Sequence, residues 1–403
     1  MKCGAQARVW VVLVLTLSVL STGCWDRVET NDLAIVGMAG MDRLENGQLL
    51  LSVAIVVPSR FGVPSGGTGG GGGGGGEAQA RLVVTLSASG VDVAEAVSRL
   101  QMQVPRQLFW GQMRVLVLGE EFARSGVRAS MDFWLRHRQP RLTTHVVVVP
   151  GQARAFLERV WPTLRSNPAE AIREVIRSHY GVESMLRDFL EALASDSQDP
   201  VAPRFELVAV EGKDGARREA QMTGTALFRD DKLVGWLDMQ QTRGLTWLRG
   251  ETQRGTVTDV IQGRGAVSFV LVRSRSRLTA RLEGDKVTAA LNLLTEDDVE
   301  DNGAGLDLSK PEEIAKLEPR LAKRLEDRIR SSFQTITRQY GVDPMGLGEA
   351  LHRADPRAWA QVRGQWHKLL PEAGLEVVVG AHVRRTGKVS SPLTRPRGSE
   401  TAP

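Results

Sequence analysis

The chain has 403 residues, 42% of them hydrophobic and 25% charged, which is typical of a globular protein with room for two or three domains. Its formal net charge of +5 is too small to favour a nucleic-acid-binding protein. Its two cysteines, Cys3 and Cys24, are too few for a disulfide framework or a cysteine-ligated metal site. The fold must therefore be stabilised by hydrophobic burial rather than by cross-links.

Residues 1–23 are predicted to form a lipoprotein signal peptide. Lys2 and Arg8 supply the positive segment, residues 9–20 the apolar segment and residues 21–23 the small side chains before a cleavage point. The apolar segment is shorter than the roughly 20 residues that a membrane-spanning helix needs. We expect cleavage before Cys24, which would then carry a diacylglycerol and an N-acyl chain, enough for stable anchoring. The alternative is an ordinary secretory signal in which Cys24 is incidental.

Residues 24–200 are predicted to form an N-terminal α/β domain, because strands alternate with helices. The first two strands form a predicted hairpin around the turn Glu45-Asn46-Gly47. The predicted strands are residues 33–41, 49–57, 82–86, 115–118 and 146–149. The predicted helices are residues 93–100, 122–135, 153–160, 168–178 and 185–194. Asp92 and Ser184 are the expected N-caps of the first and last of these helices.

A glycine-rich run at residues 66–76 interrupts this domain after the hairpin. Ordering so many glycines costs conformational entropy, so we expect a flexible loop. A phosphate-binding loop would require Lys followed by Ser or Thr, whereas Glu77 and Ala78 follow the run.

Two further domains and a tail are predicted downstream. Residues 204–262 read as a small β-rich middle domain, in which strand 225–228 pairs with strand 233–237. Residues 263–388 read as a C-terminal α/β domain, and residues 389–403 as a disordered tail. The predicted fold class is α+β or mixed α/β, a three-domain body with mixed β-sheets flanked by helices behind the signal peptide.

The C-terminal domain is expected to contain a three-stranded meander, a long amphipathic helix, a helix with two tryptophans and a closing strand. The meander strands are residues 267–272, 278–282 and 287–293. The long helix presents one apolar stripe and stops near Gly341. The stripe comprises Leu317, Leu321, Leu325, Ile329, Phe333 and Ile336. Trp359 and Trp366 are predicted to share one helix, and residues 375–383 form the closing strand.

No catalytic residue is predicted. The six histidines form no His-Glu-x-x-His motif, and no Gly-x-Ser-x-Gly elbow is present. The best metal candidate is the acidic stretch 296–302, where Asp298, Glu300 and Asn302 alternate before Gly303 as in a calcium loop. Ser309 stands where that loop needs a bidentate acid, so we predict a solvated turn. The chain is thus expected to be no enzyme and to hold no metal and no cofactor apart from the lipid.

The tryptophans and one charged pair remain as candidate contacts. We expect Trp110, Trp134, Trp161, Trp236, Trp359 and Trp366 to be core residues rather than ligand-stacking residues. Trp25 suits the membrane interface beside the lipid, and Trp247 lies in a polar segment that indicates surface exposure. Asp238 and Arg243 form either an ion pair or a partner contact, and both interpretations stay open.

The residues after Cys24 carry a family resemblance. Residues 25–36 read Trp-Asp-Arg-Val-Glu-Thr-Asn-Asp-Leu-Ala-Ile-Val, which resembles the start of the mature Ger(x)C proteins, the C subunits of spore germinant receptors. The resemblance continues in order through most of the chain. Its further blocks are residues 106–111, 114–119, 225–237, 242–251, 355–366 and 384–387.

This resemblance implies a non-catalytic, lipid-anchored subunit of a nutrient germinant receptor that is required for spore germination. It implies a three-domain α/β fold, partnership with the integral-membrane A and B subunits, and a location on the outer face of the spore inner membrane or cell membrane. The candidate partner contacts are Trp25, Asp26, Arg27, Asn31, Asp32, Asp238, Arg243 and Trp247. The alternative is a lipid-anchored solute-binding protein that delivers a small nutrient to a transporter, which would require two similar lobes around a cleft.

Overall fold

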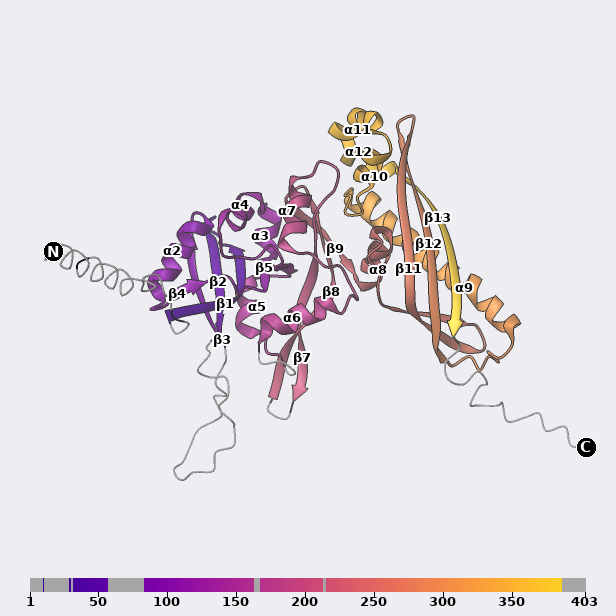
Figure 1. The fold of residues 1–403 in the computed structure, drawn as a ribbon, viewed down its shortest axis with the longest axis horizontal. Helices are drawn as coiled ribbons and strands as arrows, with labels where there is room; N and C mark the ends of the chain where they lie inside the picture. Colours follow the sequence, from indigo (N-terminus) through magenta and orange to yellow (C-terminus); the bar gives the residue numbers. More distant parts are fainter. Residues whose placement is uncertain are drawn as a thin grey trace, which may run out of the picture.

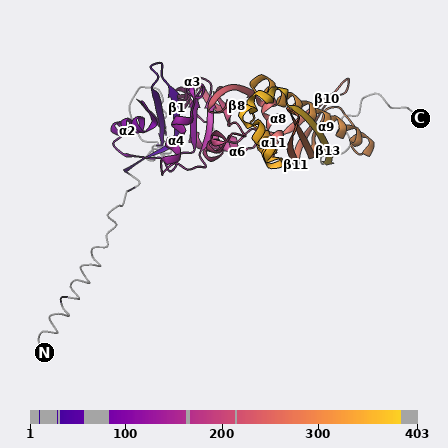
Figure 2. The same cartoon turned by 90° about the horizontal axis from the view of Figure 1, so that it is seen from above.

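A computed structural model of the chain describes residues 32–56, 83–162, 167–212 and 215–385, together with Trp10 and Glu29. These residues form an elongated body of two units that follow one another along the long axis (Figures 1 and 2). The predicted signal peptide, the glycine-rich run and the predicted tail lie outside the described residues, apart from Trp10. Within the described part, no helix has the length and apolarity to cross a membrane.

The first unit is built on a mixed sheet of nine strands in the order β3-β2-β1-β5-β6-β7-β8-β9, with β4 also paired to β1. The strands are β1 (Leu33–Arg43), β2 (Leu49–Val56), β3 (Val83–Gly90), β4 (Gln107–Phe109), β5 (Val115–Gly119), β6 (His145–Val149), β7 (Val201–Gly212), β8 (Gly215–Arg229) and β9 (Lys232–Asp238). The predicted hairpin is confirmed as the antiparallel pair β1–β2. The central strands β1, β5 and β6 run parallel, as expected when helices connect them.

Helices cover both faces of this sheet. They are α2 (Val93–Gln103), α3 (Glu120–Ser125), α4 (Arg128–Arg136), α5 (Ala153–Arg159), α6 (Pro168–Arg177) and α7 (Leu186–Ala194). In β5, Leu116 and Leu118 join the core under α2, α3, α4 and α7. Val115 and Val117 join the opposite core under α5 and α6. Because both faces are buried, the strand reads as a continuous apolar run rather than an alternating one.

The helix predicted at residues 122–135 is interrupted. Gly126 has a φ of 107°, which a helix cannot accommodate, and it separates α3 from α4. The amide of Val127 instead donates to the carbonyl of Asp231. Leu135, near the end of α4, is 59% exposed.

The two predicted N-caps have different outcomes. Asp92 caps α2 as predicted, since its carboxylate accepts a hydrogen bond from the amide of Glu95 at 2.8 Å. The prediction for Ser184 is wrong, because the N-cap of α7 is Met185. The carbonyl of Ser184 accepts from the amide of Val146 at 2.8 Å, so this segment is held against β6.

The segment predicted as a middle domain is divided between the two units. Strands β7, β8 and β9 extend the first sheet, because β7 pairs with β6 at Arg204 and Val148. Helix α8 (Met239–Arg249) then leads into β10 (Thr256–Ile261), which belongs to the second sheet. The predicted pairing of strand 225–228 with strand 233–237 is confirmed as β8–β9.

The second unit is a four-stranded sheet in the order β10-β11-β12-β13, with β11 (Gly265–Glu283), β12 (Lys286–Asn302) and β13 (Gly374–Arg385). Strands β11 and β12 form one long antiparallel hairpin, and β13 lies parallel to β12. The predicted turn at residues 296–302 is wrong, because these residues pair with β11 and, up to Asp298, also with β13. The mixed α/β class is confirmed, with two mixed sheets.

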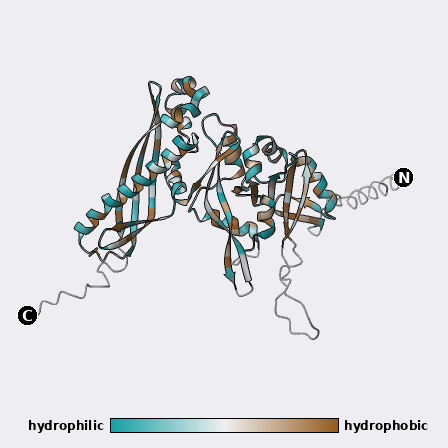
Figure 3. Ribbon diagram, turned by 180° about the vertical axis from the view of Figure 1, so that it is seen from behind, coloured by the Kyte–Doolittle hydropathy of each residue, from teal (hydrophilic) through white to brown (hydrophobic). Residues whose placement is uncertain are grey.

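One face of the second sheet is covered by the long helix α9 (Pro311–Gln334), which continues as a π-helix (Thr335–Tyr340). The predicted stripe from Leu317 to Ile336 is buried, and Gly341 ends the helix with a φ of 59°. Figure 3 shows hydrophilic and hydrophobic residues mixed along α9, as expected for an amphipathic helix.

Short helices complete this unit: α10 (Leu347–Ala354), α11 (Pro356–Val362), α12 (Trp366–Leu369) and two 3₁₀ turns (Arg363–Gln365 and Leu370–Glu372). Trp359 and Trp366 were predicted on one helix, but they lie on α11 and α12. The turn at residues 363–365 separates these helices and lets the two rings meet edge to face with centroids 5.2 Å apart.

Candidate functional site

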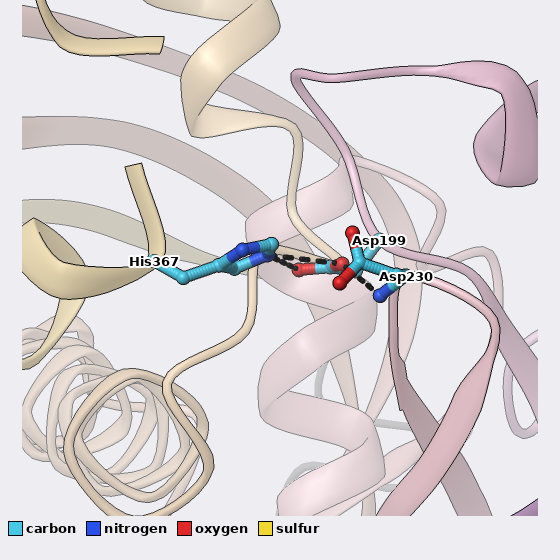
Figure 4. Close-up of side chains that lie close together, drawn as sticks. All are labelled: Asp199, Asp230 and His367. Carbon is cyan, nitrogen blue, oxygen red and sulfur yellow. Dashed lines mark hydrogen bonds and ion pairs between the residues drawn. The ribbon is translucent and has the colours of Figure 1, made fainter. Parts of the chain in front are cut away.

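A group of three titratable side chains, Asp199, Asp230 and His367, lies where the two units meet (Figure 4). Asp199 is in the connection between α7 and β7, and Asp230 is in the turn between β8 and β9. His367 is on α12, more than 130 residues further along the chain. The fold thus brings residues of the first sheet against the helices of the second unit.

Asp199 is the centre of this group. It is 4% exposed, and its two carboxylate oxygens accept hydrogen bonds from three segments. Oδ2 accepts from the Asp343 amide at 2.7 Å and lies 2.9 Å from Nε2 of His367. Oδ1 accepts from the Asp230 amide at 3.0 Å. The Asp199 amide in turn donates to the Asp343 carbonyl at 2.9 Å, so two hydrogen bonds join these residues, one of them between backbone groups.

Asp343 extends the group into the second unit. It is fully buried, and its carboxylate accepts from the amides of Leu347 at 2.9 Å and Gly348 at 2.7 Å. These are the first amides of α10, so Asp343 satisfies donors that the helix itself leaves free. The indole Nε1 of Trp366 donates to the same carboxylate at 3.1 Å. We call Asp199, Asp230, Asp343, Trp366 and His367 the interdomain network.

Two protonation equilibria are shifted in the interdomain network. The hydrogen bond to Asp199 raises the pKa of His367 above its usual value, although partial burial opposes the shift. Burial raises the pKa of Asp343 to about 6, although the Gly348 and Leu347 amides lower it. A protonated His367 therefore neutralises the Asp199 carboxylate, and near pH 6 Asp343 is itself partly neutral.

Asp199, Asp230 and His367 also form the described group with the spacing of metal ligands, since one side-chain ligand atom from each lies within 4.8 Å of the others. An imidazole and two carboxylates suit a divalent transition metal. In this arrangement, however, both oxygens of Asp199 already accept N–H donors, and Nε2 of His367 faces Asp199. The geometry is that of a satisfied hydrogen-bonded link, and a metal would require His367 to be deprotonated and turned.

A second contact joins the units beside the interdomain network. The guanidinium of Arg229 donates to the carbonyl of Tyr340, and the Tyr340 hydroxyl donates to the carbonyl of Trp236 at 3.1 Å. The Tyr340 ring lies against Gly235 so closely that a Cβ there would collide with it. Polar and packing contacts therefore both join the two units.

Of the predicted contacts, Arg243 and Trp247 lie on α8, and Asp238 is the N-cap residue just before it. Asp238 does not pair with Arg243 in the described structure: its Oδ1 accepts from the Gln241 amide at 2.8 Å, and Gln241 Oε1 accepts from the Asp238 amide at 3.0 Å. This reciprocal pair is a capping box at the start of α8. Arg243 is half-buried, and burial lowers its pKa.

The prediction that Trp247 is exposed is wrong, because its side chain is 1% exposed in the core of the second unit. Asp32 is exposed just before β1. The predicted lipidation site Cys24 and the other predicted contacts lie outside the described residues; these contacts are Trp25, Asp26, Arg27 and Asn31. The structure therefore does not gather the predicted contacts into one site.

The sequence pattern did not single out Asp199, Asp343 or His367. Asp199 lay at the end of the predicted N-terminal domain, and His367 was one of six scattered histidines. One signal was present: Asp199 and Asp343 each precede a proline. An Asp-Pro dipeptide favours a turn in which the carboxylate reaches nearby amides.

Two family models match the chain in order. The model of the spore germination protein N-terminal domain matches residues 26–207, and the model described as spore germination B3/GerAC like, C-terminal, matches residues 223–387. Together they span most of the chain. The protein therefore belongs to the Ger(x)C family of spore germination proteins, as the residues after Cys24 indicated.

Individual relatives agree with this assignment. Spore germination protein KC of Bacillus subtilis (strain 168) is 26% identical over 402 residues, covering 95% of this chain and 96% of the relative. Spore germination protein GerQC of Bacillus cereus is 20% identical and covers 93% of this chain and 98% of the relative. The crystal structure of the GerBC protein superposes with a TM-score of 0.54 at 17% identity, covering 86% of this chain and 96% of that chain, which supports the same fold.

Proposed function

We propose that the protein is a non-catalytic, lipid-anchored subunit of a nutrient germinant receptor complex. The observation that carries the proposal is the position of the two family matches, which begin at residue 26, two residues after Cys24, and end at residue 387. The family is one of spore germination proteins and is not a known enzyme family. The predicted leader thus precedes the part of the chain that the family shares.

The anchor gives this body a physical role. Acyl chains on Cys24 would confine it to the outer face of the spore inner membrane and raise its effective concentration near integral-membrane partners. We propose the A and B subunits of the receptor as these partners. The hydrogen bonds between the two units support a subunit whose units dock together on these partners.

The alternative, a solute-binding protein that delivers a nutrient to a transporter, would need two similar lobes. The described structure has a nine-stranded mixed sheet and a four-stranded sheet of different topology. This asymmetry favours the receptor-subunit interpretation.

The anchor is tested by replacing Cys24. In spores that produce Cys24→Ala, we expect the protein to leave the membrane fraction or to keep its leader, and nutrient-triggered germination to fall, because no thiol remains to carry the lipid. Fractionation of spore membranes and the intact mass of the protein provide the measurement.

Cys3→Ala is the matched control, since Cys3 is in the leader and should leave the mature protein unchanged. A Cys24→Ala protein that stays fully membrane-bound and supports normal germination would contradict the proposal. Co-purification of membrane proteins with the native chain identifies the partners.

A further inference from the structure

A cleft of about 500 Å³ lies in the second unit, between the end of α8, the middle of β11 and α10. It exists because β10 covers only part of the β11 edge: β10 pairs with residues 265–270. Further along, the ends of α8 and α10 lie beside β11 in place of a strand (Figure 1). Two helix ends cannot close this edge as completely as a paired strand, so a recess remains.

The lining of this cleft is strongly basic. Three arginines from three elements face it, Arg249 at the end of α8, Arg277 on β11 and Arg353 on α10. The residues that line the cleft include no aspartate or glutamate. Leu248, Leu278 and Met345 add apolar surface.

The three arginines are neutralised to different degrees. Arg249 is fixed, since Nη1 donates to the Pro344 carbonyl at 2.6 Å and Nη2 lies 2.8 Å from Glu251, yet its buried Nε has no partner. Arg353 is mostly exposed and lies 3.8 Å from Glu349. In the described part of the chain, the guanidinium of Arg277 makes no hydrogen bond or ion pair. The positive charges of Arg277 and Arg353 at the mouth of the cleft are therefore not fully neutralised.

We propose that this cleft binds a small ligand with an oxyanion group, a carboxylate or a phosphate, held by Arg277 and Arg353 above the fixed Arg249. The planar fork of a guanidinium matches the oxygens of both groups. The volume is in the range of small-molecule sites, about 300–1,000 Å³. The apolar residues provide contact for the non-ionic part of the ligand. This binding site goes beyond the proposed role as an anchored subunit.

The cleft shares a segment with the interdomain network. The Pro344 carbonyl, which accepts from Arg249, also accepts from Nε2 of Gln198 at 3.4 Å. Pro344 follows Asp343, and Gln198 precedes Asp199. The segment 343–346 therefore contributes Asp343 to the interdomain network and Met345 and Gly346 to the lining of the cleft.

Isothermal titration of the purified full chain tests the site, with citrate and inorganic phosphate as separate probes. We expect one of them to bind with one-to-one stoichiometry, and the comparison tells a carboxylate site from a phosphate site. Arg277→Gln should weaken this binding about tenfold or more, since a charge-assisted hydrogen bond is lost. Arg277 is exposed and unpaired, so the variant should melt at the wild-type temperature.

Arg275→Gln is the matched control, because Arg275 is exposed on the same strand two residues away and does not line the cleft. It should bind the probe like the wild-type chain. The proposal is overturned if neither probe binds at millimolar concentration. Equal weakening by Arg275→Gln and Arg277→Gln would also overturn it, because the effect would then be that of a basic surface. Neither result bears on Cys24 or on membrane attachment.

Discussion

Asp199 and His367 show how a single pair of residues can depend on pH. The pKa of His367 is raised by Asp199, so the pair stabilises the folded chain fully below the ordinary histidine pKa of about 6.5. The stabilisation is lost as the pH rises through the raised pKa, because the imidazole then loses its charge. The contact between the two units is therefore expected to be firmer in mildly acidic conditions.

His367→Gln tests this dependence. Glutamine keeps an N–H donor near Asp199 but cannot carry the charge, so we expect a loss of about 1 kcal/mol in the free energy of unfolding at pH 6, roughly the difference between a charge-assisted and a neutral hydrogen bond. The loss should be smaller at pH 8.5. Chemical denaturation of the wild-type chain and the variant at the two pH values gives the difference in their free energies of unfolding at each pH. Groups that titrate equally in both proteins do not contribute to this difference.

His352→Gln serves as the control, since His352 is exposed on α10 outside the interdomain network. It should show no comparable dependence on pH. An equal loss for His367→Gln at pH 6 and pH 8.5 would mean that charge on His367 does not contribute.

The contacts of the interdomain network could not be predicted from one sequence. Asp199 and His367 are separated by 168 positions, and Asp199 and Asp343 by 144. The spacing of apolar residues indicates which face of a helix or strand is buried. It does not indicate which residue, distant in the sequence, contacts that face. Trp366 was correctly predicted as a core residue, but its indole hydrogen bond to Asp343 depends on the same long-range meeting.

At the scale of elements, α8 and α9 show why one helix was predicted and the other was missed. Helix α9 buries large apolar residues at three- and four-residue spacing, a pattern that is visible in the sequence. Helix α8 crosses α9 at Gly244, where a Cβ would collide with Ser332. Its buried face also includes Thr242 and Thr246. Helix α8 therefore packs closely against α9 through small and polar residues, and its sequence shows no stripe of large apolar residues. The start and stop signals, Asp238 with Gln241 and then Gly250, were present.

The N-cap of α8 provides a test at this scale. Asp238→Ala should lower the free energy of unfolding by about 1 kcal/mol, because the Gln241 amide loses its acceptor. Asp238→Asn should have little effect, since asparagine is an equally good N-cap. Thermal melting of both variants provides the comparison. If Asp238→Ala melts like the wild-type chain but loses co-purifying membrane proteins, Asp238 is a partner contact rather than a cap.

At the scale of the whole molecule, most strands and helices were predicted, but their grouping was not. Local patterns correctly located β8 and β9 and their pairing. They carried no information that β7 would join β6, which turned a predicted separate domain into an extension of the first sheet. Sheet membership depends on neighbours distant in sequence, whereas alternation and turn residues are local.

The glycine-rich run at residues 66–76 allows a test of the connection between β2 and β3. Deleting it should change the free energy of unfolding by about 0.6 kcal/mol or less, because loop-closure entropy varies slowly with length. Thermal melting compares the deletion with a variant that carries a Gly-Ser run of equal length. A large fall in melting temperature for the deletion alone would show that this run makes stabilising contacts.

The pairing of β7 with β8 has a practical consequence for dissecting the protein. The limits of the two family matches, residues 207 and 223, fall inside these strands, which pair with each other. Fragments expressed to those limits would split this hairpin and leave unpaired backbone N–H and C=O groups on a strand of each fragment. Such exposed strand edges promote aggregation. A fragment that ends after Asp238, where β9 ends, contains all the strands of the larger sheet.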